Sequence, residues 1–410
     1  MESELFPQLF KKEFGKIVSV LCKRYGAYQL EIIEDIVCET FMLASEVWGT
    51  KGIPENPSGW LYKVAQKRLI DQLRRQQNFR DNIAPKLMEV GKNEEIDNPE
   101  LFTQIEIEDS QIKMMFLVCD PINSKETQIA LALRILCGFG ISDIADAFFC
   151  TKENINKRLQ RGKARLKKTD FMSSHLSAAE IEKRIENVLM IIYLVFNKGY
   201  FSQSSDNLLQ KEVCYEAIDL GFLLSNNLNS RREEVYALLS LMCFHASRLD
   251  ARIGPNGQHI LYDDQEREKW DKDLIGKGEE FLNKSAYGTK LSKFHLEASI
   301  AYWHTFHDNG KEKWENILLL FNYLLQLEYS PTYALNRGFA IHKVYGPETA
   351  IKEVLKLKLT DNHLYHALLG YLNTELDQVK ALNYFKKALK LANNQNSKKT
   401  ISTYIESLNN

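Results

Sequence analysis

The stretch that decides the fold of the second block of the chain is FGISDIADAFFCTKENINKRLQRGKARLKK, residues 139–168. Ser142 is suited to cap a short first helix and Thr151 to cap a second one, because each hydroxyl can accept a hydrogen bond from a free backbone N–H. At helical spacing, one side of the second helix carries only apolar or small residues, and we expect this side to pack against the rest of the protein. Its residues are Ile155, Leu159, Gly162 and Leu166. The stretch therefore predicts a helix, a turn and a helix.

The opposite side of that second helix is basic. Residues 152–168 hold eight Lys or Arg against Glu153 alone. The second helix of a helix-turn-helix can reach base edges from its first turns while flanking cations hold phosphates. The alternative is a solvated surface helix. We interpret the face as a DNA-reading surface with these candidate residues: Thr151, Glu153, Lys157, Gln160 and Arg161.

A second basic segment lies earlier, in WLYKVAQKRLIDQLRR at residues 60–75. From residue 62 to residue 80 there are six Lys or Arg against Asp71 alone. Cations on a helix can follow a phosphate backbone, and an exposed aromatic ring can capture a base that has left the stack. Trp60 has a second interpretation as a core residue, because amphipathic tryptophans often pack inward. The candidate DNA contacts of this segment are Trp60, Lys63, Lys67, Arg68, Arg74 and Arg75.

The overall pattern predicts an all-α fold. Apolar residues recur at helical spacing almost throughout the 410 residues, only nine residues are Pro, and no alternating run favours a sheet. Hydrophobic residues at 44% and charged residues at 26% are ordinary for a globular protein. The net charge of −1 conceals an uneven distribution, since residues 88–111 carry eight acidic residues and one Lys. We interpret that acidic segment as a linker, because it is too acidic to lie on phosphates.

These patterns divide the chain into four parts. Residues 1–80 contain three predicted helices, separated at Gly26 and at residues 49–57. The acidic linker occupies residues 81–110, the helix-turn-helix domain residues 111–170, and a large helical extension residues 171–410.

The end of the extension has the pattern of a helical hairpin repeat. Its order of small and large residues resembles that of a tetratricopeptide repeat (TPR). The residues that carry this resemblance are Tyr365, Leu368, Gly370, Ala381, Phe385 and Ala388. A similar phrase at residues 334–350 indicates an earlier unit of the same kind.

The segment at residues 60–75 closely resembles the part of sigma factors that recognises and melts the -10 promoter element. Upstream, IEDIVCETF at residues 33–41 resembles the segment that these factors present to the clamp coiled coil of RNA polymerase. This resemblance implies polymerase contacts at Asp35, Glu39 and Phe41. The family usually has Gln where this chain has Cys38, so the polar contact at that position is not carried over.

The order of the two modules resembles that of extracytoplasmic-function (ECF) sigma factors of the sigma-70 family. In that family the first domain binds polymerase and reads the -10 element, and a helix-turn-helix after a linker reads the -35 element. The resemblance implies an alternative sigma factor with core RNA polymerase and promoter DNA as partners.

The extension resembles that of an ECF subgroup with a long TPR-like C-terminal part. The matching phrases are YLVFNKGY at residues 193–200, LYDDQEREKWD at residues 261–271 and ALNR at residues 334–337. The subgroup more often has Glu where Lys198 stands. The resemblance implies regulation through the extension and leaves a regulatory protein open as its partner.

One alternative belongs to a different class of protein. A DNA-binding transcription regulator could use its TPR-like part to bind a partner without ever joining RNA polymerase. The clamp-like segment with Asp35 and Glu39 favours the sigma factor.

We expect no enzymatic activity and no cofactor. A set of ionisable residues gathers in the extension: His245, Arg248, Asp250, Arg252, Asp263, Asp264, Arg267 and Asp271. Acid–base chemistry could use such a set, but the sequence has no Gly-rich phosphate loop, His–Glu metal signature or nucleophile elbow. The simpler interpretation is a buried polar network or a partner groove. Ligand binding at His245, Asp263, Asp264 and Trp270 stays open.

The remaining expectations concern thiols and compartment. Seven cysteines are scattered without a C-x-x-C pair or nearby His ligands, which is typical of reduced thiols, and we assign them no metal and no disulfide. The first residues do not show the cationic segment followed by an apolar segment that is typical of a signal peptide, and the sequence has no run of about 18 apolar residues. We predict a cytoplasmic protein without membrane contact.

Overall fold

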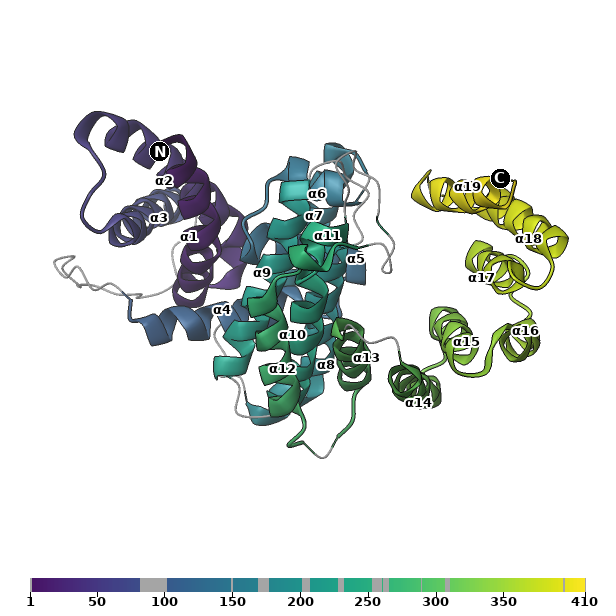
Figure 1. The fold of residues 1–410 in the computed structure, drawn as a ribbon. Helices are drawn as coiled ribbons and strands as arrows, with labels where there is room; N and C mark the ends of the chain where they lie inside the picture. The colour runs from purple at the N-terminus through teal and green to yellow at the C-terminus, as the bar shows by residue number, and fades with distance from the viewer. Residues whose placement is uncertain are drawn as a thin grey trace. The chain divides into compact units, whose positions relative to one another are not determined.

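A computed structural model of the chain describes residues 2–81, 102–148, 150–168, 177–200, 207–227, 232–252, 260, 265–288, 290–306, 310–393 and 395–409. Its elements are all helical, and no strand occurs in these ranges, which confirms the predicted all-α class (Figure 1). The chain divides into two compact units, Met1–Arg232 and Glu233–Asn410.

The first unit begins with the three predicted helices, α1 (Glu2–Tyr25), α2 (Leu30–Lys51) and α3 (Pro57–Asp81), with the short helix η1 (Ala27–Gln29) between the first two. Gly26 and Gly52 have φ of 93° and 83°, a backbone region that favours glycine, so the chain can reverse direction there. The helices pack through fully buried side chains: Phe14, Ile17, Leu21, Leu30, Ile33, Leu61 and Leu69.

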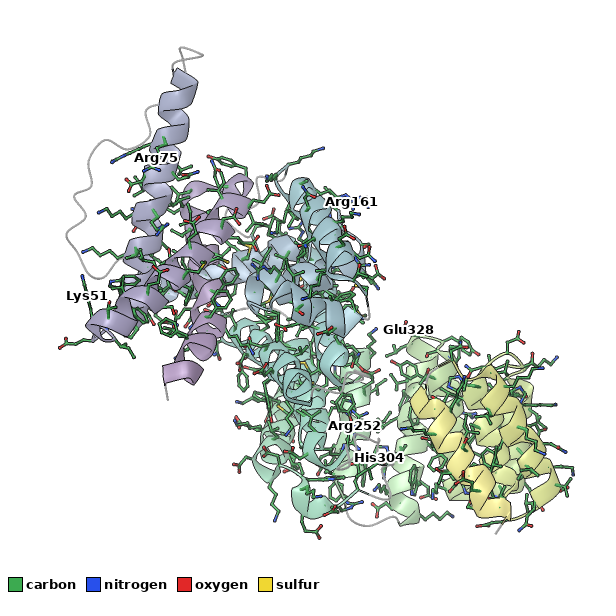
Figure 2. All side chains as sticks on the ribbon, turned by 90° about the horizontal axis from the view of Figure 1, so that it is seen from above. Lys51, Arg75, Arg161, Arg252, His304 and Glu328 are labelled. Carbon is green, nitrogen blue, oxygen red and sulfur yellow. The ribbon has the colours of Figure 1, made fainter. Side chains whose placement is uncertain are left out.

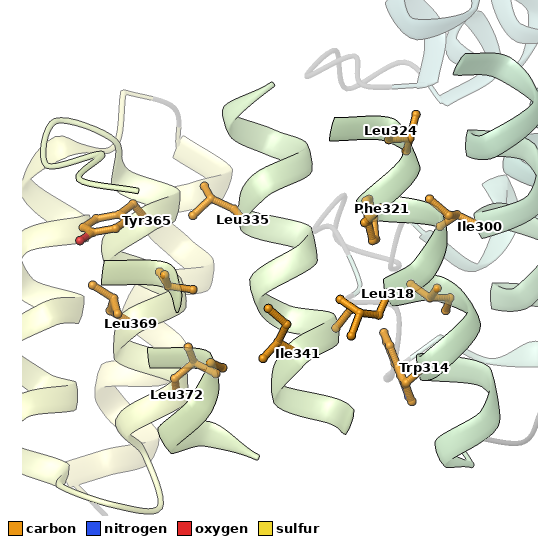
Figure 3. Close-up of a cluster of buried hydrophobic side chains, with 14 of the residues drawn as sticks. Ile300, Trp314, Leu318, Phe321, Leu324, Leu335, Ile341, Tyr365, Leu369 and Leu372 are labelled. Carbon is orange, nitrogen blue, oxygen red and sulfur yellow. The ribbon is translucent and has the colours of Figure 1, made fainter. Parts of the chain in front are cut away.

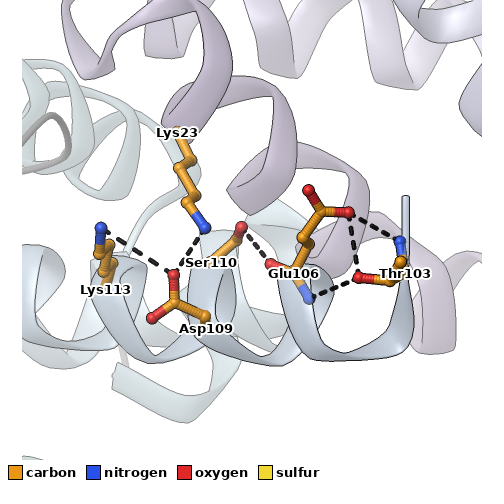
Figure 4. Close-up of polar contacts among 6 residues, drawn as sticks. All are labelled: Lys23, Thr103, Glu106, Asp109, Ser110 and Lys113. Carbon is orange, nitrogen blue, oxygen red and sulfur yellow. Dashed lines mark hydrogen bonds and ion pairs between the residues drawn. The ribbon is translucent and has the colours of Figure 1, made fainter. Parts of the chain in front are cut away.

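The next helix, α4 (Gln104–Val118), begins inside the segment predicted as a linker. Thr103 caps it, and the Glu106 carboxylate accepts from the Thr103 N–H at 2.8 Å, which lowers the pKa of Glu106 (Figure 4). Asp109 forms an ion pair at 2.6 Å with Lys23 of α1. The last part of the predicted linker is therefore a helix held against α1, while residues 82–101 lie outside the described residues.

Later in the first unit the described residues form α5 (Lys125–Leu131), the π-helical segment η2 (Ala132–Leu136), α6 (Ile141–Phe148), α7 (Lys152–Leu166), α8 (Ala178–Tyr200) and α9 (Asn207–Asn227). α8 packs against α4, α5 and α6, and α9 packs against α4 and α8. The Asn187 amide donates to the Cys119 carbonyl at 2.5 Å and to Gln128 Oε1 at 2.8 Å, and Arg184 pairs with Asp120.

The compact units therefore divide the chain at a different place from our predicted extension boundary at residues 170 and 171. α8 and α9 bury apolar faces against α4 and α5, so the first 60 or so residues of the predicted extension belong with the helix-turn-helix. Helical periodicity identified these helices, but it carries no information about which neighbour covers them.

The second unit contains α10 (Arg232–Ala246), α11 (Leu249–Arg252), η4 (Arg267–Lys269), α12 (Lys272–Ser285), α13 (Lys293–Thr305), α14 (Lys311–Leu327), α15 (Pro331–Tyr345), α16 (Pro347–Lys356), α17 (His363–Asn373), α18 (Gln378–Leu391) and α19 (Gln395–Asn409). From α12 onward each helix packs against the next one along the chain. One apolar cluster joins α13 to α17, and Figure 3 shows members of it from Ile300 to Leu372.

The predicted hairpin near the C-terminus corresponds to α17 and α18. A Cβ on Gly370 would lie 2.8 Å from the Phe385 ring, so the two helices approach closely at that point. Gly338 of α15 has the same relation to Val354 of α16, at 2.5 Å. Both hairpins place a glycine opposite an apolar side chain, as expected for repeated units that bury their faces against their neighbours.

Candidate nucleic-acid interface

The helix-turn-helix is built from α6 and α7, and the sequence predicted its packing side correctly. Thr151 caps α7, and its hydroxyl accepts from the Asn154 N–H at 3.3 Å. A Cβ on Gly162 would lie 2.7 Å from Thr127 Cγ2, so α7 packs closely on α5. The buried residues of α7 are the four expected ones: Ile155, Leu159, Gly162 and Leu166.

The predicted cap at Ser142 is wrong. α6 begins at Ile141, so Ser142 lies within its first turn. The Gly140 N–H donates to Asp143 Oδ2 at 3.1 Å, and the Gly140 carbonyl accepts from Ile144 at 3.0 Å. The acidic residue three positions after Gly140 thus satisfies the backbone at this helix start.

The candidate -35 residues all lie on the surface of the first unit. Each of the five is exposed, and Arg161 projects from α7 in Figure 2. Their set is Thr151, Glu153, Lys157, Gln160 and Arg161. These five residues comprise two cations, one carboxylate and two neutral hydrogen-bonding groups, a combination that suits phosphates and base edges.

Two other cations of the same run have partners within the first unit. Lys163 forms an ion pair with Glu34 of α2, and Lys167 forms one with Glu31. The Lys163 side chain is only 14% exposed. Two of the eight cations of the basic run thus contact α2, which the charge count alone did not show.

Arg158 and Lys198 both lie over the ring of Phe148, at 5.1 and 4.2 Å from its centroid. Burial and the neighbouring Arg158 lower the pKa of Lys198. Lys198, where the resembling subgroup more often has Glu, therefore lies at the contact between α8 and the helix-turn-helix. The Nη1 atom of Arg158 is buried here, and Arg158 and Lys198 both help to lower the pKa of the nearby Glu126.

The candidate -10 residues lie along α3. Lys63, Lys67, Arg74 and Arg75 are exposed, and the first three share one side of the helix (Figure 2 labels Arg75). Arg68 instead donates to Glu39 Oε2 at 2.7 Å, so two residues predicted for different partners form one ion pair.

The position of Trp60 agrees in part with each of its two interpretations, as an exposed DNA contact and as a core residue. Its ring packs edge-on against Trp48, with centroids 5.3 Å apart, yet the residue is only partly buried. Trp48 itself is 4% exposed and forms the inner partner of the pair.

The clamp-like segment forms the middle of α2. Asp35, Glu39 and the neighbouring Met42 are exposed at spacings of four and three, so they make one strip along the helix. Phe41 is 6% exposed, and its ring meets that of Phe10 edge-on at 4.8 Å. The structure therefore places Phe41 in the core, where it supports the helix that presents the strip.

The sequence analysis missed the residues that join the two predicted DNA-binding modules. Glu34 lies 3% exposed on the packed side of α2, between Leu30 and Phe41, and it contacts Arg134 of η2 as well as Lys163. The sequence did contain a signal: the Glu34 carboxylate falls among the apolar residues that repeat along the packed side of α2. A buried carboxylate needs a partner, so a cation from another element could have been expected there.

The ionisable set of the extension lies in the second unit. Burial and the nearby Arg248 and Arg252 hold the pKa of His245 well below its usual range, and burial with Arg248 lowers that of His304 to about 3. The guanidinium groups of Arg248 and Arg267 both lie near the Trp270 ring, at 5.6 and 4.9 Å from its centroid.

Other members of this set have structural contacts. The Asp271 carboxylate accepts from the Leu274 N–H at 2.9 Å and caps α12, while Arg267 and Lys313 both donate to the Phe306 carbonyl. Asp250 is exposed. Asp263 and Asp264 lie outside the described residues.

Three further observations bear on chemistry. Within the described ranges, no group of three or more His, Cys, Asp or Glu side chains is placed to hold a metal ion. The seven cysteines are free thiols, five of them buried. Of the helices in the described part of the chain, none combines the length and the apolarity needed to cross a membrane.

The fold defines an all-helical protein with a helix-turn-helix in its first unit and stacked helical hairpins in its second. Residues 184–286 match a family of unknown function (DUF6596), a segment that extends over parts of both units. The chain is 30% identical over 369 residues to the uncharacterized protein R00370 of Rhizobium meliloti (strain 1021), covering 89% of this chain and 87% of that protein. The chain belongs to the family of that Rhizobium protein. No solved structure matches it.

Proposed function

We propose that the protein is an alternative sigma factor of the ECF type, which binds core RNA polymerase and directs it to specific promoters. The observation that carries this proposal is the α6–α7 pair, where the packed side is buried as expected and the five candidate DNA-reading residues are exposed on α7 or at its cap. A second, separate row of exposed cations on α3 supports a second DNA contact.

The strip on α2 supports the polymerase contact. Asp35 and Glu39 present carboxylates beside the exposed thioether of Met42, which is 66% exposed. Acidic groups beside a flexible apolar side chain suit a helical partner that carries cations and apolar residues. A regulator that never joins polymerase has no need of this strip.

In this proposal the chain supplies binding surfaces and no catalysis. It acts in the bacterial cytoplasm, where RNA polymerase and promoter DNA are found. The stacked hairpins of the second unit offer an interaction surface, through which a regulatory protein or another part of the transcription complex could be bound.

The test is reconstitution with core RNA polymerase. The chain should co-purify with the core enzyme and support promoter-specific run-off transcription, with DNA affinity that falls as salt rises. If the chain neither binds core polymerase nor initiates transcription, the proposal fails, and specific DNA binding alone would favour the regulator.

A pair of double charge reversals tests the assignment of α7. Lys157→Glu with Arg161→Glu should lower -35-dependent transcription while core binding is kept. The matched control is Lys386→Glu with Lys390→Glu, which reverses two exposed lysines at the same spacing on α18. Equal loss in both variants, or loss of core binding in the first, would contradict the assignment of α7 to DNA.

A further inference from the structure

Two cations from different helices meet over one aromatic ring in the first unit. Arg158 of α7 and Lys198 of α8 lie over the ring of Phe148 at the end of α6, at 5.1 and 4.2 Å from its centroid. An aromatic ring attracts a cation, but it carries no net charge and so cannot neutralise two of them. Burial and the neighbouring Arg158 together lower the pKa of Lys198. The cluster therefore concentrates positive charge in a place where charge is costly.

Carboxylates of the described residues compensate this charge only in part. Neither Arg158 nor Lys198 forms an ion pair within the described ranges, and Arg158 Nη1 is buried there without a hydrogen-bond partner. Glu126 at the start of α5 is near enough to act on the pKa of Lys198, yet Glu126 is exposed. Hydrogen bonds from its own backbone and from Ser124 are the main causes that lower the pKa of Glu126. The cluster is therefore left with a buried donor to satisfy and an excess of positive charge.

The cluster is separate from the candidate DNA-reading residues of α7. Arg158 follows the buried Ile155 by three positions and precedes the buried Gly162 by four, so it lies towards the packed side of the helix. Lys157 and Arg161 belong to the exposed side. Arg158 thus faces the neighbouring helices α6 and α8, where its charge is less accessible to a DNA backbone than the charges of the exposed side.

We propose that Arg158 and Lys198 form a binding site for a small oxyanion, which is free phosphate or the phosphoryl group of a small molecule. Such an anion has several acceptor oxygens, so it can accept hydrogen bonds from a guanidinium and an ammonium group at once. It also brings the negative charge that the cluster lacks. Because the two cations belong to α7 and α8, the bound anion strengthens the contact of α8 with the helix-turn-helix. The inference is independent of polymerase binding.

Inorganic phosphate is the probe, and the full chain without DNA is the sample. Isothermal titration calorimetry at constant ionic strength should show saturable binding with one site per chain. Arg158→Gln removes the guanidinium, and Lys198→Glu fills the cluster with a carboxylate, so each should weaken phosphate binding by a factor of about ten or more. The matched control Lys386→Glu makes the same change of charge at an exposed lysine of α18 and should keep the native affinity.

Two further measurements separate this site from other sources of phosphate binding. Lys157→Glu with Arg161→Glu should keep the native affinity for phosphate; its loss would place the anion on the DNA-reading side and overturn the site. Phosphate should raise the urea midpoint of the native chain but not that of Lys198→Glu. An equal rise in both would be the general effect of phosphate on protein stability and would overturn the site. So would the absence of saturable binding to the native chain, or equal affinity in the native chain and the two site variants.

Discussion

Replacing Glu34 by Gln tests the buried ion cluster directly, since the substitution keeps the size of the side chain and removes its charge. In the native chain the carboxylate, 4% exposed, faces Arg134 and Lys163, whose side chains are 16% and 14% exposed. The variant leaves two largely buried cations side by side without a counter-charge.

The cost can be worked from these contacts. Removing one partner of a buried ion pair destabilises a protein by about 3 to 5 kcal/mol. Arg134 keeps its hydrogen bond to the Phe139 carbonyl at 3.1 Å and its contact with Phe14, so the lower end of that range applies, about 3 kcal/mol. The matched variant Glu31→Gln breaks a pair whose side chains are 40% and 35% exposed, and should cost less than about 1 kcal/mol.

Amide hydrogen exchange followed by mass spectrometry resolves the effect by segment in the full chain. A loss of about 3 kcal/mol corresponds to exchange on the order of 100 times faster in peptides from α2 and η2. Peptides from α18, in the other compact unit, serve as the internal reference. Equal exchange rates in Glu34→Gln and Glu31→Gln would refute the claim that the buried cluster holds the two modules together.

Three further predictions concern the first unit. Lys198→Glu should place a carboxylate beside Arg158 and raise the free energy of unfolding by about 1 kcal/mol in urea titrations; a lower urea midpoint would contradict this. Burial raises the pKa of Glu216 from 4.5 to about 7. Between these pH values the Glu216 carboxyl is protonated in the folded state but not in the unfolded state, so the free energy of unfolding should fall as pH rises from 4.5 to 7. Glu216→Gln should flatten that fall and gain on the order of 2 kcal/mol at pH 8, whereas an unchanged pH profile would show that Glu216 is not responsible. A chain cut after residue 172 should aggregate and one cut after residue 227 should remain a helical monomer by circular dichroism and gel filtration, because only the first cut removes α8 and α9; equal behaviour would place the boundary elsewhere.

Local patterns were sufficient for a large part of this protein. The spacing of Ile155, Leu159, Gly162 and Leu166 identified the packed side of α7, because a helix with one apolar stripe has one way to face its neighbours. Thr151 was recognised as a cap, since a hydroxyl before a helix has a local partner three residues on. The prediction failed at Ser142, where Gly140 and Asp143 offered a competing start two residues earlier.

The same patterns were ambiguous wherever a residue's partner is distant in the sequence. Trp60 could be read as exposed or as core, and its position depends on Trp48 in the preceding helix. Phe41 was grouped with the surface acids of its segment, yet it lies against Phe10. Helical phase gives the side on which a residue lies, but only the neighbouring helix decides whether that side is covered.

The sequence by itself determined the helical class, the turn between α6 and α7 and the side of α7 that meets solvent, because these depend on hydrogen bonds and side-chain spacing within a few residues. Only the tertiary structure decided that Lys163 and Lys167 contact α2, that α8 and α9 belong with the helix-turn-helix, and that the two basic modules are packed together. The physical reason is that an ion pair such as Glu34–Arg134 joins residues 100 positions apart, and nothing in the local pattern of either segment specifies the other.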